Sequence, residues 1–315
     1  MSDFPLFPEQ ASSVAWQVDG LYFLLIGLTV FFSIIVFGLV GFFAIKYRRR
    51  SPDEMPKQNH GSLPMELAWT IIPLFMAIGV FTVGADVFFR LMRTPADPME
   101  VYVIGKQWMW KLQHEEGKRE INTLHVPLGQ TVRLTMTSED VIHDFFIPAF
   151  RVKNDVIPGR YTTMWFEATK LGEFHIFCAE YCGTQHSGMI GKVVVMDPTD
   201  FDNWLSDGAG AGPAETPVQA GARKFEELAC HTCHKQTSGG RGPSLIGLYN
   251  RDSERLTSGQ EVQIDDNYVR TSILNPHSQI VEGYTPIMPI FEGQINEETL
   301  LQLIAYIKSL SEESE

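Results

Sequence analysis

Two long apolar runs lie in the N-terminal part of the chain. Residues 21–45 contain no charged side chain, and residues 67–91 carry only Asp86 and Arg90, close to the far end. A helix needs about 20 apolar residues to cross a bilayer. The pattern therefore predicts a transmembrane hairpin over residues 21–92. We expect the first run to be a retained span and not a cleaved signal peptide, because it is too long and no basic segment precedes it.

The connector between the two runs is basic. Lys46, Arg48, Arg49 and Arg50 lie at its start, and Lys57 follows. Because positively charged loops stay in the cytoplasm, we expect residues 46–62 to be cytoplasmic and the N-terminal segment, residues 1–20, to lie outside. The predicted location is the inner membrane of a bacterium, spanned more than once, with both termini and everything after about residue 92 on the periplasmic side.

Beyond the hairpin, the pattern changes twice. Residues 99–196 alternate apolar and polar side chains, with many β-branched and aromatic residues, which predicts short strands in a β-sandwich or barrel. We assign this domain to residues 93–200. A Gly-, Ala- and Pro-rich stretch marks a linker over residues 201–217. Residues 218–315 lose the strand pattern and contain apolar positions at helical spacing, so we expect a small all-α domain there.

The chain is acidic, with a formal net charge of -13 and a pI of about 5.2. This balance argues against nucleic acid as a partner, because phosphate binding requires a basic face. Residues 221–315 hold eight Lys and Arg against fourteen Asp and Glu. An acidic face steers a basic electron donor by long-range attraction, although the same charges can form an ordinary solvated surface.

The four cysteines fall into two motifs, and the first predicts copper. Cys178 and Cys182 are followed by His186 and Met189, all within twelve residues. Thiolate, imidazole and a weakly bound thioether on a β-sandwich are typical ligands of a copper site that transfers electrons, and a second thiol permits two coppers. His143, predicted at a strand edge, can supply the second imidazole. The alternative for the two thiols is a disulfide in an oxidising compartment.

The second motif is Cys230-His-Thr-Cys233-His234, the attachment signature of a c-type haem. The two thiols form thioethers to the haem, and His234 binds the iron. No cysteine is left over, so the chain carries two adjacent redox centres and is typical of an electron-transfer protein.

The run from residue 141 to 189, which includes Asp155-Val-Ile-Pro-Gly-Arg160, resembles the CuA domain of cytochrome c oxidase subunit II. The sequences Glu66-Leu-Ala-Trp-Thr-Ile-Ile-Pro and Gly105-Lys-Gln-Trp108-Met-Trp110 resemble the same family, over residues 15–200 in total. The resemblance implies a cupredoxin-like sandwich that binds two coppers through the side chains of His143, Cys178, Cys182, His186 and Met189.

The same resemblance implies further roles. Glu180 would give one copper its backbone carbonyl, and its carboxylate would reach a Mg²⁺ or Mn²⁺ at the interface with subunit I. Trp108 would be the aromatic residue where electrons enter near the copper, although it can also be plain core. Glu66 would be the mouth of a proton path shared with subunit I, or a simple interfacial carboxylate. Lys153 and Asp155 would make interfacial hydrogen bonds.

Residues 218–310 resemble a class I cytochrome c. This family implies Met288 as the sixth iron ligand and Pro243 as a neighbour of the proximal histidine. A methionine in this position raises the haem potential relative to a second histidine. The remaining histidines match no ligand position and are interpreted as ordinary: His114, His125, His175, His277, with His231 facing solvent.

A subunit II fused to cytochrome c is the pattern of caa(3)-type oxidases. The resemblance implies that haem c accepts electrons from an external donor and passes them to CuA. CuA would then supply haem in subunit I, where O₂ reduction is coupled to proton pumping. We expect subunit I, subunit III, a small redox protein and the lipid bilayer as partners, and no oxygen chemistry on this chain. Two alternatives remain: a nitrogen-oxide reductase subunit with a CuA domain, and a non-enzymatic membrane copper-binding module.

Overall fold

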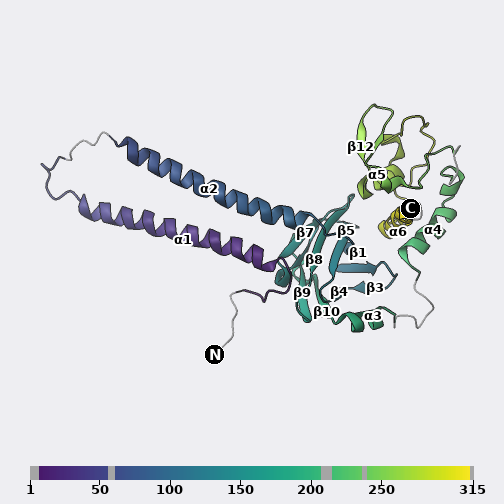
Figure 1. The fold of residues 1–315 in the computed structure, drawn as a ribbon, viewed down its shortest axis with the longest axis horizontal. Coiled ribbons are helices and arrows are strands. Elements are labelled where there is room, and N and C mark those ends of the chain that lie inside the picture. Colours follow the sequence, from purple (N-terminus) through teal and green to yellow (C-terminus); the bar gives the residue numbers. More distant parts are fainter. Residues whose placement is uncertain (1–6, 56–60, 207–214, 236–239, 313–315) are drawn as a thin grey trace. The chain divides into compact units, whose positions relative to one another are not determined.

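The computed structural model describes residues 7–55, 61–206, 215–235 and 240–312 (Figure 1). It divides into two compact units. One comprises residues 14–93. The other comprises residues 1–13 together with residues 94–315, and it contains both cysteine motifs.

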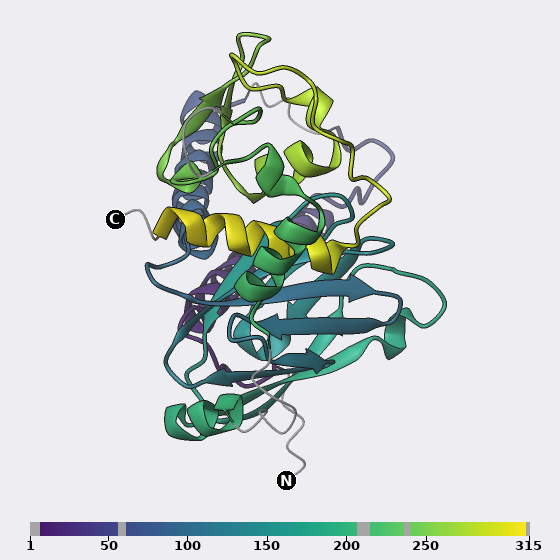
Figure 2. The same ribbon diagram turned by 90° about the vertical axis from the view of Figure 1, so that its right-hand side faces the viewer.

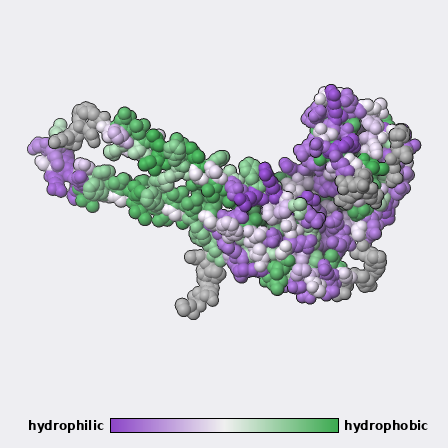
Figure 3. All heavy atoms as spheres, in the orientation of Figure 1, coloured by the Kyte–Doolittle hydropathy of each residue, from purple (hydrophilic) through white to green (hydrophobic). Residues whose placement is uncertain are grey.

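The first unit consists of two long helices, α1 (Ala15–Lys46) and α2 (Leu63–Met92). Both are long and apolar enough to cross a membrane, and their surfaces are covered with apolar side chains (Figure 3). Helices of a water-soluble protein bury such side chains, whereas helices in lipid expose them. The prediction of a helical hairpin is confirmed, with one difference: α1 begins at Ala15, six residues before the predicted start, because residues 15–20 continue the helix.

The second unit begins with a sandwich of two five-stranded sheets. One sheet has the order β3-β2-β1-β5-β8, and the other has the order β4-β10-β9-β6-β7. The large side chains of Trp110, Phe145 and Phe166 are fully buried. The strands are β1 (Met99–Lys106), β2 (Met109–His114), β3 (Arg119–Ile121), β4 (Thr123–Pro127), β5 (Thr131–Ser138), β6 (His143–Ile147), β7 (Val152–Val156), β8 (Thr162–Glu167), β9 (Gly172–Cys178) and β10 (Ile190–Met196).

The segment before the first helix belongs to this sandwich. The Ala11 backbone amide donates to the Ala149 carbonyl oxygen at 2.9 Å, and the Ala11 carbonyl oxygen accepts from the Thr169 backbone amide at 2.9 Å. Ser12 Oγ donates to the Phe150 carbonyl at 2.7 Å. The sequence predicted no contact for this segment, because such pairing depends on residues far along the chain.

The sandwich also extends further than its strands. Helix α3 (Pro198–Ser206) follows β10, and its Phe201 side chain is buried. Residues 201–206 were predicted as linker, and this prediction is wrong. The segment is helical, and burial of the apolar Phe201 side chain stabilises it in this position. The rest of the predicted linker falls mostly on residues 207–214, which lie outside the described part of the chain.

The last part of the second unit is a small helical domain. It contains α4 (Pro217–Glu227), α5 (Asp266–Leu274) and α6 (Glu297–Glu312). Helix α4 crosses α6 at close range (Figure 2). A Cβ on Gly221 would lie 2.0 Å from the Gln302 carbonyl oxygen, so only glycine permits this crossing. The domain was predicted as all-α, but it also contains a two-stranded sheet, β11 (Ser253–Arg255) and β12 (Glu261–Gln263).

Candidate copper and haem sites

The predicted copper ligands come from three neighbouring parts of one sheet. His143 begins β6, Cys178 ends β9, and the remaining ligands lie on the loop that joins β9 to β10. Strands β6 and β9 are adjacent and antiparallel, with Phe145 opposite Cys178. This register places the start of one strand beside the end of the other, so residues 35 positions apart in sequence meet. We call residues 178–189 the copper loop.

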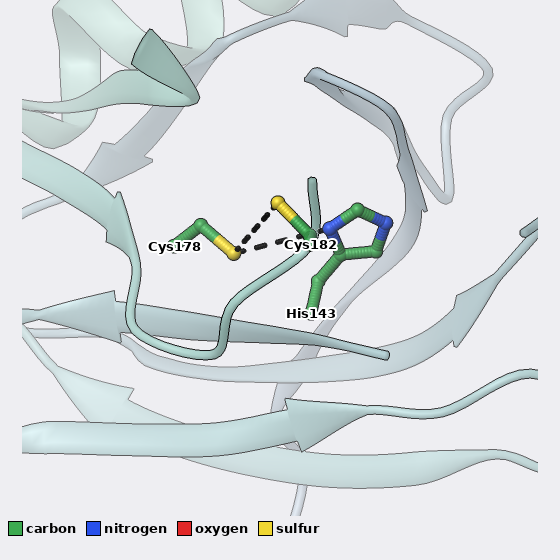
Figure 4. A group of neighbouring side chains, drawn as sticks. All are labelled: His143, Cys178 and Cys182. Carbon is green, nitrogen blue, oxygen red and sulfur yellow. Dashed lines mark hydrogen bonds between the residues drawn. The ribbon is translucent and has the colours of Figure 1, made fainter. Parts of the chain in front are cut away.

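The two thiols and the first imidazole point toward one another (Figure 4). Cys178 Sγ lies 3.7 Å from Cys182 Sγ and 3.8 Å from His143 Nδ1. A disulfide requires about 2.05 Å between sulfurs, so these cysteines are free thiols in this structure. Within the described residues, these three form the one group of histidines, cysteines or carboxylates compact enough to hold a metal ion.

The other predicted ligands complete the ring of donors. Cys182 Sγ lies 3.5 Å from His186 Nδ1 and 3.9 Å from Met189 Sδ. Cys178 Sγ lies 3.1 Å from the Glu180 carbonyl oxygen. Two thiols, two imidazoles, one thioether and one carbonyl therefore cluster around the Sγ atoms of Cys178 and Cys182. Soft sulfur donors combined with imidazole suit copper, and the two central thiols are suited to bridging two ions.

The two thiols differ in acidity. Burial opposes charge on both. At Cys178, hydrogen bonds from His143 and from backbone amides outweigh burial and lower the pKa to about 7. At Cys182, burial and the neighbouring Cys178 raise the pKa to about 12. One sulfur is thus readily available as thiolate, and a bound metal must displace the proton of the other.

Two residues that the sequence did not single out hold this site in place. Asp140 Oδ1 lies 2.9 Å from His143 Nε2, on the far side of the ring from the thiols. Asp140 Oδ2 accepts from the Gln107 amide at 2.8 Å. Gln107 Nε2 in turn donates to the Cys182 carbonyl at 2.7 Å. A carboxylate three residues before a metal-binding histidine is the signal that could have indicated Asp140.

Trp108 lies against the same loop. A Cβ on Gly183 would be 3.3 Å from Trp108 Cζ2 and 2.9 Å from Gln107 Nε2, and Gly183 has a φ of +122°. Glycine is therefore required at position 183, both because a side chain has no space there and because φ is positive. Trp108 is half-buried, whereas Trp110 is the fully buried tryptophan of the core. The structure brings Trp108 to the edge of the copper loop.

The second motif lines a cavity of about 430 Å³ in the helical domain. Cys230, Cys233 and His234 border it on one side, and Met288 borders it as well. The other lining residues are mainly apolar, including Val269 and Ile307. The size is in the range of ligand cavities in proteins. An apolar cavity with two thiols, an imidazole and a thioether on its walls fits a covalently attached haem.

The imidazole of His234 has one fixed nitrogen. Its Nδ1 lies 2.8 Å from the Pro243 carbonyl oxygen, which leaves Nε2 available to a ligand. Burial lowers the pKa of His234 and so favours the neutral ring. A Cβ on Gly242 would lie 2.8 Å from the ring, which explains the glycine there. His277, which we interpreted as an ordinary histidine, also borders the cavity.

The histidines interpreted as ordinary have structural contacts. His114 Nε2 lies 2.9 Å from Glu120 Oε1, and Glu120 also contacts His125. His175 stacks on Phe177.

Two further residues singled out in the sequence lie outside the copper loop. Lys153 Nζ lies 3.2 Å from Asp144 Oδ2. In the other unit, Glu66 lies in the first turn of α2 with its side chain exposed.

Three sequence families match this chain. The family described as "Cytochrome C oxidase subunit II, transmembrane domain" matches residues 3–84, and "Cytochrome C oxidase subunit II, periplasmic domain" matches residues 118–196. "Cytochrome C oxidase, cbb3-type, subunit III" matches residues 216–307. Cytochrome c oxidase subunit 2 of Alkalihalophilus pseudofirmus is 30% identical over 306 residues, which cover 94% of this chain and 87% of that protein. The chain belongs to the cytochrome c oxidase subunit II family.

One further relative and one solved structure are similar to parts of the chain. Cytochrome c oxidase subunit 2 of Thermostichus vulcanus is 31% identical over 255 residues, covering 63% of this chain and 77% of that protein. The periplasmic domain of subunit II of cytochrome oxidase from Bradyrhizobium japonicum is 32% identical and covers 36% of this chain and 96% of that structure, with a TM-score of 0.35.

Membership of the subunit II family confirms several predictions. The protein is an electron-transfer subunit of a haem-copper oxidase, an oxidoreductase, and it carries a C-terminal cytochrome c domain. It is a membrane protein with an extracytoplasmic domain and works with other oxidase subunits. The family implies copper and haem c as its cofactors. It favours the oxidase over the nitrogen-oxide reductase and the copper-binding module.

Proposed function

We propose that electrons from an external donor enter haem c on residues 218–315, pass to a binuclear CuA on the copper loop, and leave for haem in subunit I, where O₂ is reduced and protons are pumped. The observation that carries this proposal is the clustering of six donor atoms, the two thiols of Cys178 and Cys182 and four donors beside them. They belong to His143, Cys178, Glu180, Cys182, His186 and Met189.

The residues of the copper loop have separate tasks in this proposal. The thiolates of Cys178 and Cys182 would hold both ions, and His143 and His186 would each hold one of them. Met189 and the Glu180 carbonyl are the weaker ligands. Asp140 fixes the orientation of the His143 ring through its far nitrogen. Fixed ligands change little between oxidation states, which keeps the reorganisation for electron transfer small.

In the helical domain, Cys230 and Cys233 would attach the haem, and His234 and Met288 would bind its iron. The Pro243 carbonyl keeps His234 in the required orientation. A methionine ligand gives the haem a higher potential than a second histidine would, which suits a donor to copper. Trp108, half-buried at the copper loop, is our proposed aromatic residue where electrons enter the copper site.

The remaining assignments concern the membrane and the partners. We place residues 46–62 in the cytoplasm and both termini on the periplasmic side of a bacterial inner membrane, because the connector is basic. The exposed Glu180 carboxylate would offer one oxygen to a Mg²⁺ or Mn²⁺ shared with subunit I. Glu66 would open a proton path at that same partner. Subunit III and a small redox protein complete the proposed set of partners.

Electron paramagnetic resonance on the full-length chain, purified in detergent with copper and haem, tests the copper assignment. Two coppers that share one unpaired electron give a seven-line hyperfine pattern, whereas a single copper gives four lines. We expect seven lines, and their loss in Cys182→Ser. His175→Ala is the matched control, because His175 stacks on Phe177 outside the ring of donors. A four-line spectrum of the parent protein would rule out the binuclear site.

A further inference from the structure

Strand β1 is buried on both faces, which is unusual for a strand in a sandwich whose strand pairs are mostly antiparallel. One face of such a sheet normally packs on the core and the other meets water. Val101 and Val103, on the inner face, are completely buried, yet Tyr102 and Ile104, on the outer face, are only 7% and 6% exposed. Another part of the molecule must therefore cover the outer face.

The cover is the cytochrome domain. Tyr102, Ile104 and the nearby Tyr161 belong to the same apolar cluster as Leu301 and Ile304 of α6. We call Tyr102, Ile104 and Tyr161 the outer-face patch. The core of the haem domain thus continues without interruption onto the sheet.

Polar contacts fix the orientation of the two domains. The Tyr161 amide donates to Asn267 Oδ1 at 2.7 Å, and Asn267 Nδ2 donates to the Tyr161 carbonyl at 3.4 Å. The Arg270 guanidinium lies 5.1 Å from the centre of the Tyr161 ring and is held by Glu297. At the rim, Arg119 pairs with Glu298 at 2.6 Å. Such directional contacts select one arrangement, which apolar contact alone would not.

The elements that meet here also reach both cofactor sites. In α5, Asn267 and Arg270 contact Tyr161, while their neighbours Tyr268 and Val269 line the haem cavity. In β1, Ile104 lies on the outer face, and the next residue, Gly105, lies on the inner face. A Cβ on Gly105 would be 2.9 Å from Cδ2 of His143. Strand β1 is therefore a single layer of chain between the haem domain and a copper ligand.

We propose that the outer-face patch holds the cytochrome domain in a fixed position, and that electrons from its haem reach His143 across β1. This inference rests on the proposed function, in which haem c is the donor to copper. Ile104, Tyr161, Asn267 and Arg270 are positioning residues in this proposal. For electrons that come from the haem of this chain, this route replaces the entry at Trp108 proposed above, which lies at the turn between β1 and β2.

The electron-transfer rate depends on the length of the linker between α3 and α4 if the domain is tethered, and it does not depend on that length if the domain is docked. A domain that diffuses on a tether has an effective concentration that falls roughly as the −3/2 power of linker length. A docked domain is insensitive to that length. We therefore expect the rate of haem-to-copper electron transfer in the full chain to stay the same when ten Gly and Ser residues are inserted into the linker. A rate that falls with length overturns the proposal.

Substitutions in the interface provide the complementary test. The double variant Ile104→Ala with Asn267→Ala should slow haem-to-copper transfer on the order of tenfold or more, because the docked population is lost. The haem potential and the copper spectrum should not change. Ile121→Ala is the matched control, since Ile121 belongs to the same sheet but is 63% exposed. An unchanged rate in the double variant, or a greater loss in Trp108→Phe, overturns the route across β1.

Hydrogen exchange tests the docking without reference to electron transfer. The Tyr161 amide is bonded to Asn267, so Asn267→Ala should accelerate its exchange, while the Ile121→Ala control should not. Unaltered exchange at Tyr161 contradicts docking. If the parent chain passes no electrons from haem to copper although Tyr161 is protected, the proposed electron route is wrong and the docking stands.

Discussion

In the copper loop, the donor atoms already lie within 4 Å of their neighbours, whereas in the haem domain the corresponding residues stand around an apolar cavity of about 430 Å³. The copper ligands are brought together by the register of two strands and by hydrogen bonds to Asp140 and Gln107. The proposed haem ligands lie on a short 3-10 helix, Cys230–Thr232, and on loops, and they line the cavity for the cofactor.

This difference indicates how each domain depends on its cofactor. The sandwich has its own core, with Trp110, Phe145 and Phe166 fully buried, so its fold should survive without copper. The small helical domain has the haem at its centre, so it should not survive without haem. The predictions below test this contrast, starting with the largest expected effect.

Preventing haem attachment should unfold the helical domain. In Cys230→Ala with Cys233→Ala, the cavity of 430 Å³ would lose its cofactor. The apolar side chains that line this cavity would then lose a large packing partner. Whole domains are stable by only about 5–15 kcal/mol. Far-ultraviolet circular dichroism and limited proteolysis should show the loss of α4, α5 and α6 while the sandwich persists. A helical domain that resists protease without haem would contradict the contrast.

Removing a copper ligand should abolish the metal centre and leave the fold intact. His186→Ala takes one imidazole from the ring of donors, since His186 Nδ1 lies 3.5 Å from Cys182 Sγ. We expect loss of the copper absorption and resonance signals, with haem content and the melting temperature of the metal-free sandwich unchanged. Simultaneous loss of haem would mean that the two domains fold interdependently. His175→Ala serves as the control, because that ring lies elsewhere.

Replacing the proposed sixth haem ligand should change the potential and not the fold. Met288→Ala should lower the haem potential and slow transfer to copper, because the thioether ligand that favours the reduced haem is gone. Redox titration of the haem absorption measures the effect. Ile287→Ala is the neighbouring control, since Ile287 also borders the cavity but has no ligand atom. An unchanged potential in the methionine variant would assign the sixth position to another residue.

The smallest effect concerns Glu120, within the sandwich. Burial by itself would raise the pKa of Glu120, but hydrogen bonds from His114 and His125 outweigh burial and lower the pKa below its usual 4.5. A carboxyl group with a lowered folded-state pKa stabilises the fold above its unfolded pKa, and that contribution is lost as the pH falls through the folded value. Glu120→Gln should therefore reduce the free energy of unfolding at pH 7 by about 1–3 kcal/mol.

The difference between parent and Glu120→Gln should shrink as the pH falls below about 4.5, because the unfolded parent then binds a proton at Glu120 and the folded carboxylate follows at a lower pH. Urea unfolding of the sandwich at several pH values measures it. Glu173→Gln is the control, because Glu173 is 60% exposed and pairs with Lys192 at the surface. A pH-independent difference would show that Glu120 acts through packing and not through its charge.

Local patterns made the element types and the metal motifs predictable. The uncharged run of residues 21–45 indicated a membrane helix by its length alone, and Cys230, Cys233 and His234 are adjacent enough to be recognised without a fold. The copper ligands on residues 178–189 were predictable for the same reason. His143 needed the additional expectation that a strand edge lies beside the copper loop, which the pairing of β6 with β9 provides.

Predictions went wrong where burial by distant residues decides the structure. Residues 201–206 have a composition compatible with linker, but Phe201 is buried and the segment is helical. Asp140 and Gln107 are ordinary polar residues in the sequence. Their importance comes from bonds to His143 and to the Cys182 carbonyl, which join three loops.

The sequence by itself determined the membrane hairpin and the order of the domains and predicted a set of metal ligands, because most of these features depend on residues close together along the chain. Only the tertiary structure decided that six candidate donors cluster around the thiols of Cys178 and Cys182 and that β1 is buried on both faces. Successive side chains of β1 point to opposite faces of the sheet, so the sequence could indicate which side chains share a face. It could not indicate what covers that face. The cover comes from α5 and α6, more than 150 residues later, and is set by the packing of the whole unit.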